Sequence, residues 1–223
     1  MVRRPLLLVA GLVVVAGCTR PSAAAYTTQI IPTTQTTIPA TVTSTSVLKV
    51  PLPPPEQIVI TGAGFDLHAA GRVPSVAFDA AWAGVLATLN RYLEAGVLTP
   101  LRSGGPAGDL TPLFTGPAAE RVMAATPDRG AFIDEGLPQL SDIRKDSAVA
   151  ALTALAGTDG VMSVVTARLD LRLVGHVNGA PVTVARTGEL VLMPEGGSWR
   201  IDAYDVKVVR SVAEETTTTR ARS

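Results

Sequence analysis

Large apolar side chains recur every three or four positions in the first half of the chain, just after Pro74. They are Phe78, Trp82, Val85, Leu89 and Tyr92. This spacing puts all of them on one face of an amphipathic helix that packs on the core. Pro74 and Ser75 form a typical start signal, so we expect the helix to begin there and to end near Gly96.

Shorter helical elements are expected further along the chain. Residues 101–106 read Leu-Arg-Ser-Gly-Gly-Pro, which predicts a loop. A short helix is predicted over Pro117–Ala125, because Pro117 is well tolerated in a first helical turn. Residues 131–146 have no dominant period, and there we expect only a helical turn around Ile133–Glu135.

The second half of the chain alternates between apolar and polar positions, which is the period of β-strands. The expected strands are Ala148–Ala156, Val161–Val174, Val182–Met193 and Trp199–Arg210. The sequence therefore predicts an α+β fold, with N-terminal helices packed on an antiparallel sheet of four or more strands. Gly62-Ala63-Gly64, ahead of the first helix, is interpreted as a turn.

Asn178-Gly179 is a strong signal for a two-residue hairpin turn. Pairing Val177 with Ala180 sets Leu173 opposite Val184, Leu171 opposite Arg186 and Arg168 opposite Glu189. This register gathers the apolar side chains on one face of the sheet and most charged side chains on the other. It also forms a favourable cross-strand pair between Arg168 and Glu189.

The next hairpin is expected to turn through a four-residue loop, 194–197. That loop sets Leu192 against Trp199, Leu190 against Ile201, Gly188 against Ala203 and Arg186 against Asp205. The two registers together place Arg186 and Asp205 on the face that is otherwise apolar. An ion pair in such a place must be well satisfied or must be reached by water.

Arg186 and Asp205 are therefore the best candidates in the sequence for a polar anchor in an apolar pocket. The candidate pocket also includes the aromatic residues Trp82, Tyr92 and Trp199. The fork of an arginine suits a carboxylate or phosphate head group on an apolar ligand. Two other arrangements fit the same pattern. One is a structural ion pair at the mouth of the fold, and the other is a β-bulge near Gly188 that turns both charges outward.

The N-terminus has the pattern of a secretory leader. Two arginines are followed by an apolar run at 6–16 and by small residues before Cys18, which is the only cysteine. Residues 15–18 resemble the lipobox of bacterial lipoproteins. The resemblance implies a leader at 1–17, an acyl (palmitate-type) anchor on Cys18 and a location at the outer face of the cell membrane. The alternative is an ordinary signal peptide with a chance cysteine.

The rest of the chain divides by composition. Residues 18–57 are rich in Thr, Pro and Ser and carry few charges, which is typical of a disordered tether. A single domain is expected over 58–213, with its core at 75–210. A second polar segment, 214–223, contains four consecutive threonines and is predicted to be a disordered tail.

Composition also argues against several classes of function. Nineteen basic residues balance nineteen acidic ones without a basic cluster, so nucleic-acid binding is not expected. Two histidines and one cysteine supply few ligands for a transition metal, and neither a metal nor another cofactor is expected. Nucleophile-elbow, Walker and H-E-x-x-H patterns are missing from the sequence. Asp134 and Glu135 are adjacent, so their side chains should point apart rather than share acid–base work.

Helices followed by a meander of long strands, ending in Trp199-Arg200-Ile201-Asp202-Ala203-Tyr204, resemble the nuclear transport factor 2-like superfamily. The resemblance covers Ser75–Arg210, and secreted or lipid-anchored members of this kind occur in actinobacteria. It implies a strongly curved, cone-like sheet that wraps around the leading helix and encloses a pocket. A cystatin-like or other helix-on-sheet fold is the structural alternative.

Enzymes of that superfamily place Asp, His or Tyr in the pocket, and this chain matches their pattern poorly. Asp170, Asp202, His68 and His176 are all interpreted as solvated polar residues. We therefore favour a non-enzymatic, lipid-anchored extracytoplasmic domain that binds a small apolar ligand or another envelope protein. The alternatives are a pocket enzyme of the isomerase or hydrolase type and a protein-interaction scaffold.

Overall fold

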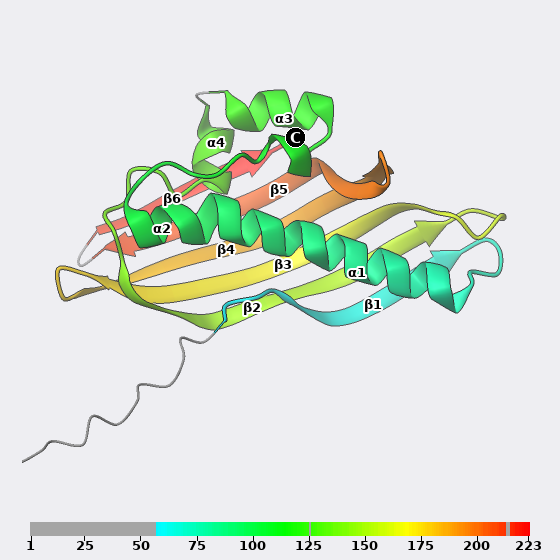
Figure 1. Ribbon diagram of the computed structural model, residues 1–223, viewed down its shortest axis with the longest axis horizontal. Helices are drawn as coiled ribbons and strands as arrows, with labels where there is room; N and C mark the ends of the chain where they lie inside the picture. Colours follow the sequence, from blue (N-terminus) through cyan, green and yellow to red (C-terminus); the bar gives the residue numbers. More distant parts are fainter. Residues whose placement is uncertain (1–56, 125, 213–214) are drawn as a thin grey trace, which may run out of the picture. The chain divides into compact units, whose positions relative to one another are not determined.

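Figure 1 shows the computed structural model, which describes residues 57–124, 126–212 and 215–223. These residues belong to one compact unit, Leu52–Ser223. Its strands are β1 (Thr61–Ala69), β2 (Ser141–Ala156), β3 (Met162–Val177), β4 (Ala180–Glu195), β5 (Ser198–Val212) and β6 (Glu215–Arg222). They form a six-stranded sheet in the order of the chain. The expected α+β class is confirmed, and the sheet has two strands more than the four segments found in the sequence.

All neighbouring strands are antiparallel except β1 and β2, which run parallel. A parallel pair needs a long crossover, and here the helices supply it. The helical elements are α1 (Ser75–Tyr92), a π-helical turn (Leu93–Leu98), α2 (Thr99–Ser103), a 3₁₀ turn (Thr111–Leu113), α3 (Gly116–Met123) and α4 (Pro127–Phe132). In Figure 1 they lie over one face of the sheet.

The expectation that helices come first is wrong, because β1 precedes α1. Gly62-Ala63-Gly64 lies inside this strand rather than in a turn, and the register of β1 shifts between Gly62 and Gly64. A β-carbon on Gly62 would stand 2.1 Å from the ring of Trp82, so the strand can pass beneath the indole only with glycine here. This close approach explains Gly62, the first of the two glycines that suggested a turn.

The first helix begins at Ser75 as expected but does not end at Gly96. Helical structure continues through the π-helical turn and α2 to Ser103. Gly96 is buried, and a β-carbon there would stand 2.8 Å from the carbonyl oxygen of Phe132. Gly96 therefore permits a close contact, whereas Gly104, with φ of 65°, provides the left-handed cap that ends the helix.

The helical turn expected around Ile133–Glu135 lies slightly earlier in the chain, as α4 at Pro127–Phe132. Pro127 starts it, since proline fits the first helical turn. Ile133 already has an extended backbone, with φ of −122° and ψ of 130°. The predicted helix at 117–125 is found as α3, Gly116–Met123.

The register of the first hairpin is confirmed pair by pair. Val177 pairs with Ala180, Leu171 with Arg186 and Arg168 with Glu189. The inner face of β3 and β4 is buried as expected, in an alternating pattern along both strands. The buried side chains of this face belong to the same hydrophobic core as those of α1, and their burial stabilises the domain.

The predicted register of the second hairpin is wrong in two ways. Its loop has two residues, Gly196 and Gly197, both with positive φ, and it joins Glu195 to Ser198. A register shift also falls between Val191 and Leu192, whose partners are Ala203 and Ile201, so that Asp202 has no partner across the ladder. Because of this extra residue, each later side chain of β5 points to the opposite face of the sheet from the one predicted.

The segment expected to be a disordered tail instead contains β6, which pairs with β5. Threonine is β-branched and suits a strand, so a polar composition does not prevent pairing here. Ala221 is buried in the core, and Arg220 and Arg222 form ion pairs with Asp205 on β5. In the described part of the chain, no helix is long and apolar enough to cross a membrane.

Candidate functional site

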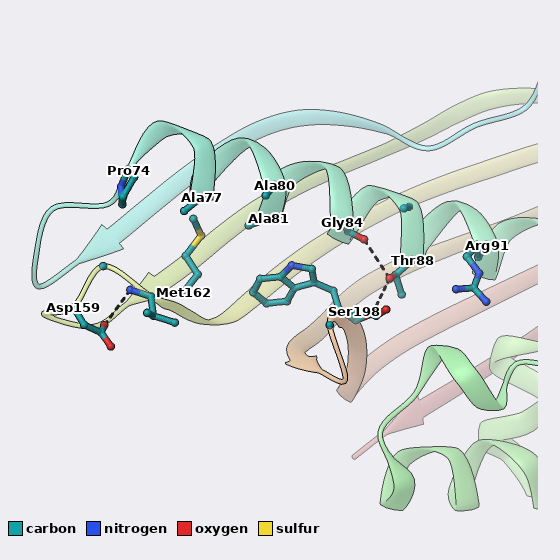
Figure 2. A pocket seen from close by; sticks show the side chains of 15 residues that line it. Pro74, Ala77, Ala80, Ala81, Gly84, Thr88, Arg91, Asp159, Met162 and Ser198 are labelled. Atoms are coloured by element: carbon teal, nitrogen blue, oxygen red, sulfur yellow. Dashed lines mark hydrogen bonds between the residues drawn. The ribbon is translucent and has the colours of Figure 1, made fainter.

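A cleft of about 620 Å³ runs beside α1, between this helix, the turn joining β2 to β3, and the turn joining β4 to β5. Its volume falls in the range of small-molecule sites. Pro74 and the small residues of α1 line the cleft, as Figure 2 shows, and the residues of α1 follow one another at helical spacing: Ala77, Ala80, Ala81, Gly84, Ala87 and Thr88. Because these side chains are short, they leave space between helix and turns.

Trp199, at the start of β5, forms one wall of the cleft and is tied to the helix. A β-carbon on Gly84 would stand 2.7 Å from Cδ1 of the indole, so the ring rests on the helix backbone. Thr88 Oγ1 donates a hydrogen bond to the carbonyl oxygen of Trp199 at 2.7 Å. It also contacts the carbonyl of Gly84, one turn earlier, at 3.2 Å. The β4–β5 turn is therefore fastened to the middle of α1.

The second wall comes from the β2–β3 turn. Val161 donates its backbone N–H to Asp159 Oδ1 at 3.0 Å, which fixes this turn from within. Gly160 has φ of 75°, and a β-carbon there would stand 2.4 Å from the carbonyl oxygen of Arg72. Beyond it, Val161 is 60% exposed at the cleft, while Met162 is buried.

The cleft has opposite charges at its two ends. Figure 2 shows Asp159 at one end, near Pro74, and Arg91 at the other. The lining between them is mostly apolar. The cleft can therefore hold an apolar body along its length, with charge complementarity only at the ends.

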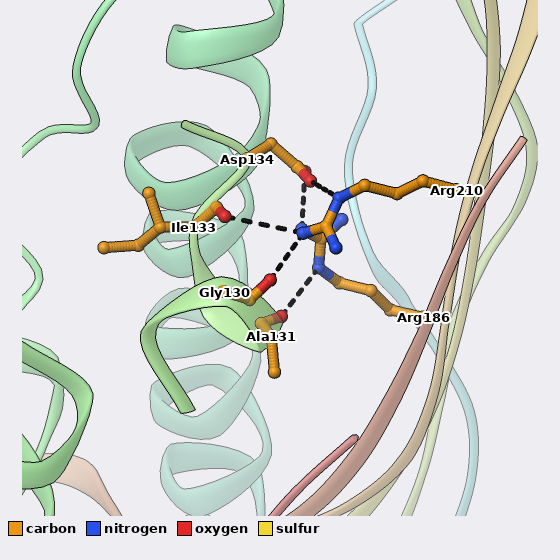
Figure 3. Close-up of polar contacts among 6 residues, drawn as sticks. All are labelled: Gly130, Ala131, Ile133, Asp134, Arg186 and Arg210. Carbon is orange, nitrogen blue, oxygen red and sulfur yellow. Dashed lines mark hydrogen bonds and ion pairs between the residues drawn. The ribbon is translucent and has the colours of Figure 1, made fainter. Parts of the chain in front are cut away.

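A separate cluster of charges lies inside the fold, and Figure 3 shows its contacts. Arg186 projects from β4 into the core and donates from Nη2 to Asp134 Oδ2, and both side chains are fully buried. Arg210, from β5, donates from Nε to the other oxygen of the same carboxylate at 2.8 Å. One aspartate thus joins two strands to the segment that follows α4.

The backbone of α4 completes the cluster. Arg210 Nη2 donates to the carbonyl of Gly130 at 2.6 Å, and Arg186 Nε donates to the carbonyl of Ala131 at 3.3 Å. These oxygens lie in the last turn of α4, where the helix has unpaired carbonyls and a partial negative charge. They balance part of the excess positive charge of two guanidinium groups on one carboxylate.

The surroundings of Arg186 favour its charged form. Burial alone would lower the pKa of Arg186, but Asp134 and Tyr92 beside it favour its charged form, so the net shift is upward. Burial raises the pKa of the Tyr92 phenol, and Arg186 opposes this effect. Within the described structure, Tyr92 Oη and Arg186 Nη1 are buried without a well-formed hydrogen bond. Arg186 and Asp134 are sealed from solvent, while the side chain of Arg210 is 11% exposed. The buried pair holds the segment after α4 on the sheet.

The candidate pocket predicted from the sequence is therefore only partly assembled. Arg186 faces inward as expected, but its acidic partner is Asp134 and not Asp205. The bulge at Asp202 turns Asp205 to the outer face of the sheet. There Arg220 donates to it from Nε at 2.8 Å and from Nη2 at 2.7 Å, and Arg222 donates at 2.9 Å. Hydrogen bonds from Arg220 and then Arg222 hold the pKa of Asp205 well below its usual range.

Of the three aromatic candidates, only Trp199 lines the cleft. Trp82 is on a different side of α1 and packs against Phe65 of β1, with ring centroids 5.6 Å apart. Tyr92 is fully buried and stacks edge-on against Phe132 at 5.6 Å. The structure therefore brings only Arg186 and Tyr92 together, in the core, and places Asp205, Trp82 and Trp199 in three other parts of the fold. Cys18 lies outside the described residues.

Sequence reasoning missed Asp134 as a core residue and the small-residue face of α1. The expectation that Asp134 and Glu135 point apart is correct, because Glu135 turns outward to an ion pair with Arg129 at 2.7 Å. Asp202 is also not merely solvated, since Thr115 Oγ1 donates to it at 2.8 Å. The spacing of alanines and glycine beside the apolar stripe was the available signal for the cleft.

Among the described residues, no group of three or more His, Cys, Asp or Glu side chains is placed to hold a metal ion. Comparison of the chain with protein families, with curated proteins and with solved structures found no match.

Proposed function

We propose that this chain is an envelope protein whose folded domain binds a small apolar ligand in the cleft beside α1. The observation that carries the proposal is a hollow of about 620 Å³ lined by short apolar side chains of α1, with Trp199 and Met162 facing them. Ligand sites are typically concave, mostly apolar and polar at a few points, and this cleft has those properties.

Binding without catalysis accounts best for the charged groups. The Asp134–Arg186 pair has the burial and charge of a catalytic pair, but its side chains are 0% exposed and no substrate reaches them. In the cleft itself, Asp159 is occupied by the backbone of its own turn. An isomerase or hydrolase would need a reactive group within hydrogen-bond reach of its substrate.

A protein partner is the second candidate. The outer face of the sheet has a hollow of about 730 Å³, lined by side chains of both charges that include Arg168, Asp170 and Lys207. In Figure 1 the helices lie on the opposite face. Mixed charges on an uncovered sheet suit a polar protein surface better than an apolar small molecule.

The membrane anchor and the family resemblance are part of the same proposal. We propose that Cys18 is acylated after leader cleavage and that residues 18–57 tether the domain to the outer face of the membrane. Labelling with an alkyne fatty acid should mark the chain and should fail with Cys18→Ser. We further propose a cone-like variant of the nuclear transport factor 2-like fold, supported by helices over one face of a meander of long strands, although β1 is an addition before α1.

Ligand binding in the cleft can be tested by placing a large side chain at an exposed position of its lining. Ala80 is exposed and lines the cleft, whereas Ala83 is exposed on the same helix and does not. The full chain with Cys18→Ser would be incubated with an envelope lipid extract and measured by native mass spectrometry. We expect a bound adduct that Ala80→Trp abolishes and Ala83→Trp retains. Equal adducts in both variants would place the ligand elsewhere, and no adduct in the parent chain would favour the protein partner.

A further inference from the structure

Arg91 lines the cleft, and its positive charge is not balanced by a contact within the described structure. It is exposed, and it has no hydrogen-bond or ion-pair partner among the described residues. Glu94, one helical turn further along, is an obvious local partner by spacing. Its carboxylate instead binds Arg102 Nη1 at 2.8 Å. The guanidinium of Arg91 is therefore available to a ligand.

The opposite end of the cleft has a different character. Asp159 carries a negative charge there, and its Oδ1 is fixed by the backbone of Val161. Two valines beside this end are highly exposed: Val161 at 60% and Val76, between the lining residues Pro74 and Ala77, at 74%. An anionic group would be repelled at this end, while an apolar chain would cover valine surface that now faces water.

The two ends are far enough apart to separate a head group from a chain. The lining follows α1 from Ala77 to Arg91, which corresponds to about 21 Å of helix. Between them the helix contributes alanine, glycine and threonine, and the facing walls contribute Trp199 and Met162. Thr88 is the only hydroxyl of α1 in the lining, and it is occupied by the carbonyls of Gly84 and Trp199.

From this arrangement we infer that the cleft selects amphiphiles with one anionic head group, carboxylate or phosphate. The head group binds Arg91, and the apolar chain lies along α1 towards Met162 and Val161. This inference rests on the proposed function and adds the class and the orientation of the ligand. The arginine fork matches both kinds of anion, so either a fatty acid or a lipid phosphate meets the requirement.

The test compares ligands that share one chain and differ only in the head group. Decanoate, decyl phosphate, decanol and decyltrimethylammonium would be titrated calorimetrically into the full chain with Cys18→Ser. We expect the two anions to bind roughly ten-fold more tightly than decanol, as one charge-assisted hydrogen bond predicts. The cationic amphiphile should bind most weakly. Comparing decanoate with decyl phosphate tells which anion the site prefers.

Arg91→Gln provides the decisive variant, and Arg72→Gln is its matched control. Arg72 is exposed and lies before α1, near the Asp159 end of the cleft, so its replacement removes the same charge. In Arg91→Gln the ratio of decanoate to decanol affinity should fall to about one, whereas Arg72→Gln should keep the ratio of the parent chain. Far-ultraviolet circular dichroism confirms that both variants are folded.

The outcomes separate the two proposals. If none of the decyl compounds binds, the apolar-ligand function itself is wrong. If decanol binds as tightly as decanoate, the function stands and the selection of anions is overturned. The selection of anions is likewise overturned if Arg72→Gln lowers the affinity ratio as much as Arg91→Gln, because the effect would then be one of net charge and not of a head-group contact.

Discussion

Arg186 of β4 and Asp134 form an ion pair in which both side chains are completely buried. Asp134 also binds Arg210 of β5, so a single carboxylate compensates two guanidinium groups. A buried charge without a partner is far more costly than a pair. The stability of the domain should therefore depend unequally on the three residues, and this asymmetry can be measured.

Asp134→Ala should be among the most damaging single substitutions in the domain. It leaves the buried Arg186 and the partly exposed Arg210 without their carboxylate, and we expect a loss of about 3–5 kcal/mol in the free energy of unfolding. The neighbouring Glu135→Gln is the control, because Glu135 pairs with Arg129 at a partly exposed site and should cost less than about 1 kcal/mol. Urea unfolding followed by circular dichroism measures both. Similar losses in the two variants would contradict the asymmetry.

Arg186→Met should be milder than Asp134→Ala, although Arg186 is the larger and equally buried side chain. After this change, Asp134 still pairs with Arg210 at 2.8 Å, and the net charge of the cluster falls from one to zero. Methionine also fills much of the volume of the arginine stem. In the same urea experiment, we expect the midpoint of Arg186→Met to lie above that of Asp134→Ala. The reverse order would show that Arg210 cannot neutralise Asp134 alone.

The inward position of Arg186 could be predicted because a local signal fixes it. Asn178 and Gly179 adopt φ of 50° and 82°, the positive angles that a tight hairpin turn requires, and the whole register of β3 and β4 follows. The acidic partner of Arg186 could not be predicted from such a local signal. Asp134 lies 52 residues away, and only the path of α4 over the sheet brings the two together.

The position of Asp205 was missed for a different reason. A two-residue turn at Gly196-Gly197 and a longer loop at 194–197 both fit the sequence. The two turns give registers that differ by two residues, so each side chain of β5 stays on the same face of the sheet in either case. The bulge at Asp202 does change it, by adding one unpaired residue. Nothing local to the strand marks this bulge. A similar limit applies to β1, because the need for Gly62 is explained only by its contact with Trp82, 20 residues further along the chain.

The attachment of β6 should weaken in acid. The pKa of Asp205 is depressed in the folded state by Arg220 and Arg222, so the stabilisation is complete above its ordinary value of 3.8 and is lost progressively as the pH falls below it. We expect the backbone amides of β6 to exchange with solvent faster there, relative to those of β3, in hydrogen-exchange mass spectrometry. Asp205→Asn should remove this difference between neutral and acidic pH. Uniform acceleration in all strands would contradict a local effect.

The passage of β1 beneath Trp82 should make Gly62 irreplaceable even by alanine. The added β-carbon would stand 2.1 Å from the indole ring, and the strand or the ring must move. We expect Gly62→Ala to cost about 1–3 kcal/mol, as overpacking does in other cores. Gly64→Ala is the control on the same strand, because nothing lies within 4 Å of its β-carbon position. Thermal unfolding of the two variants should separate them clearly, and equal midpoints would argue against the close contact.

Gly84 offers a corresponding test of the wall of the cleft. Glycine inside a helix usually destabilises it, so that replacement by alanine gains about 1 kcal/mol. Here the new methyl group would meet Trp199 Cδ1 at 2.7 Å and push the β4–β5 turn away from the helix. We therefore expect Gly84→Ala to lower the melting temperature and to shift the tryptophan emission. Gly116→Ala, with open space around it in α3, should leave the emission unchanged without lowering the melting temperature. A more stable Gly84→Ala variant would mean that Trp199 is free to move, and that the cleft is not held open by this contact.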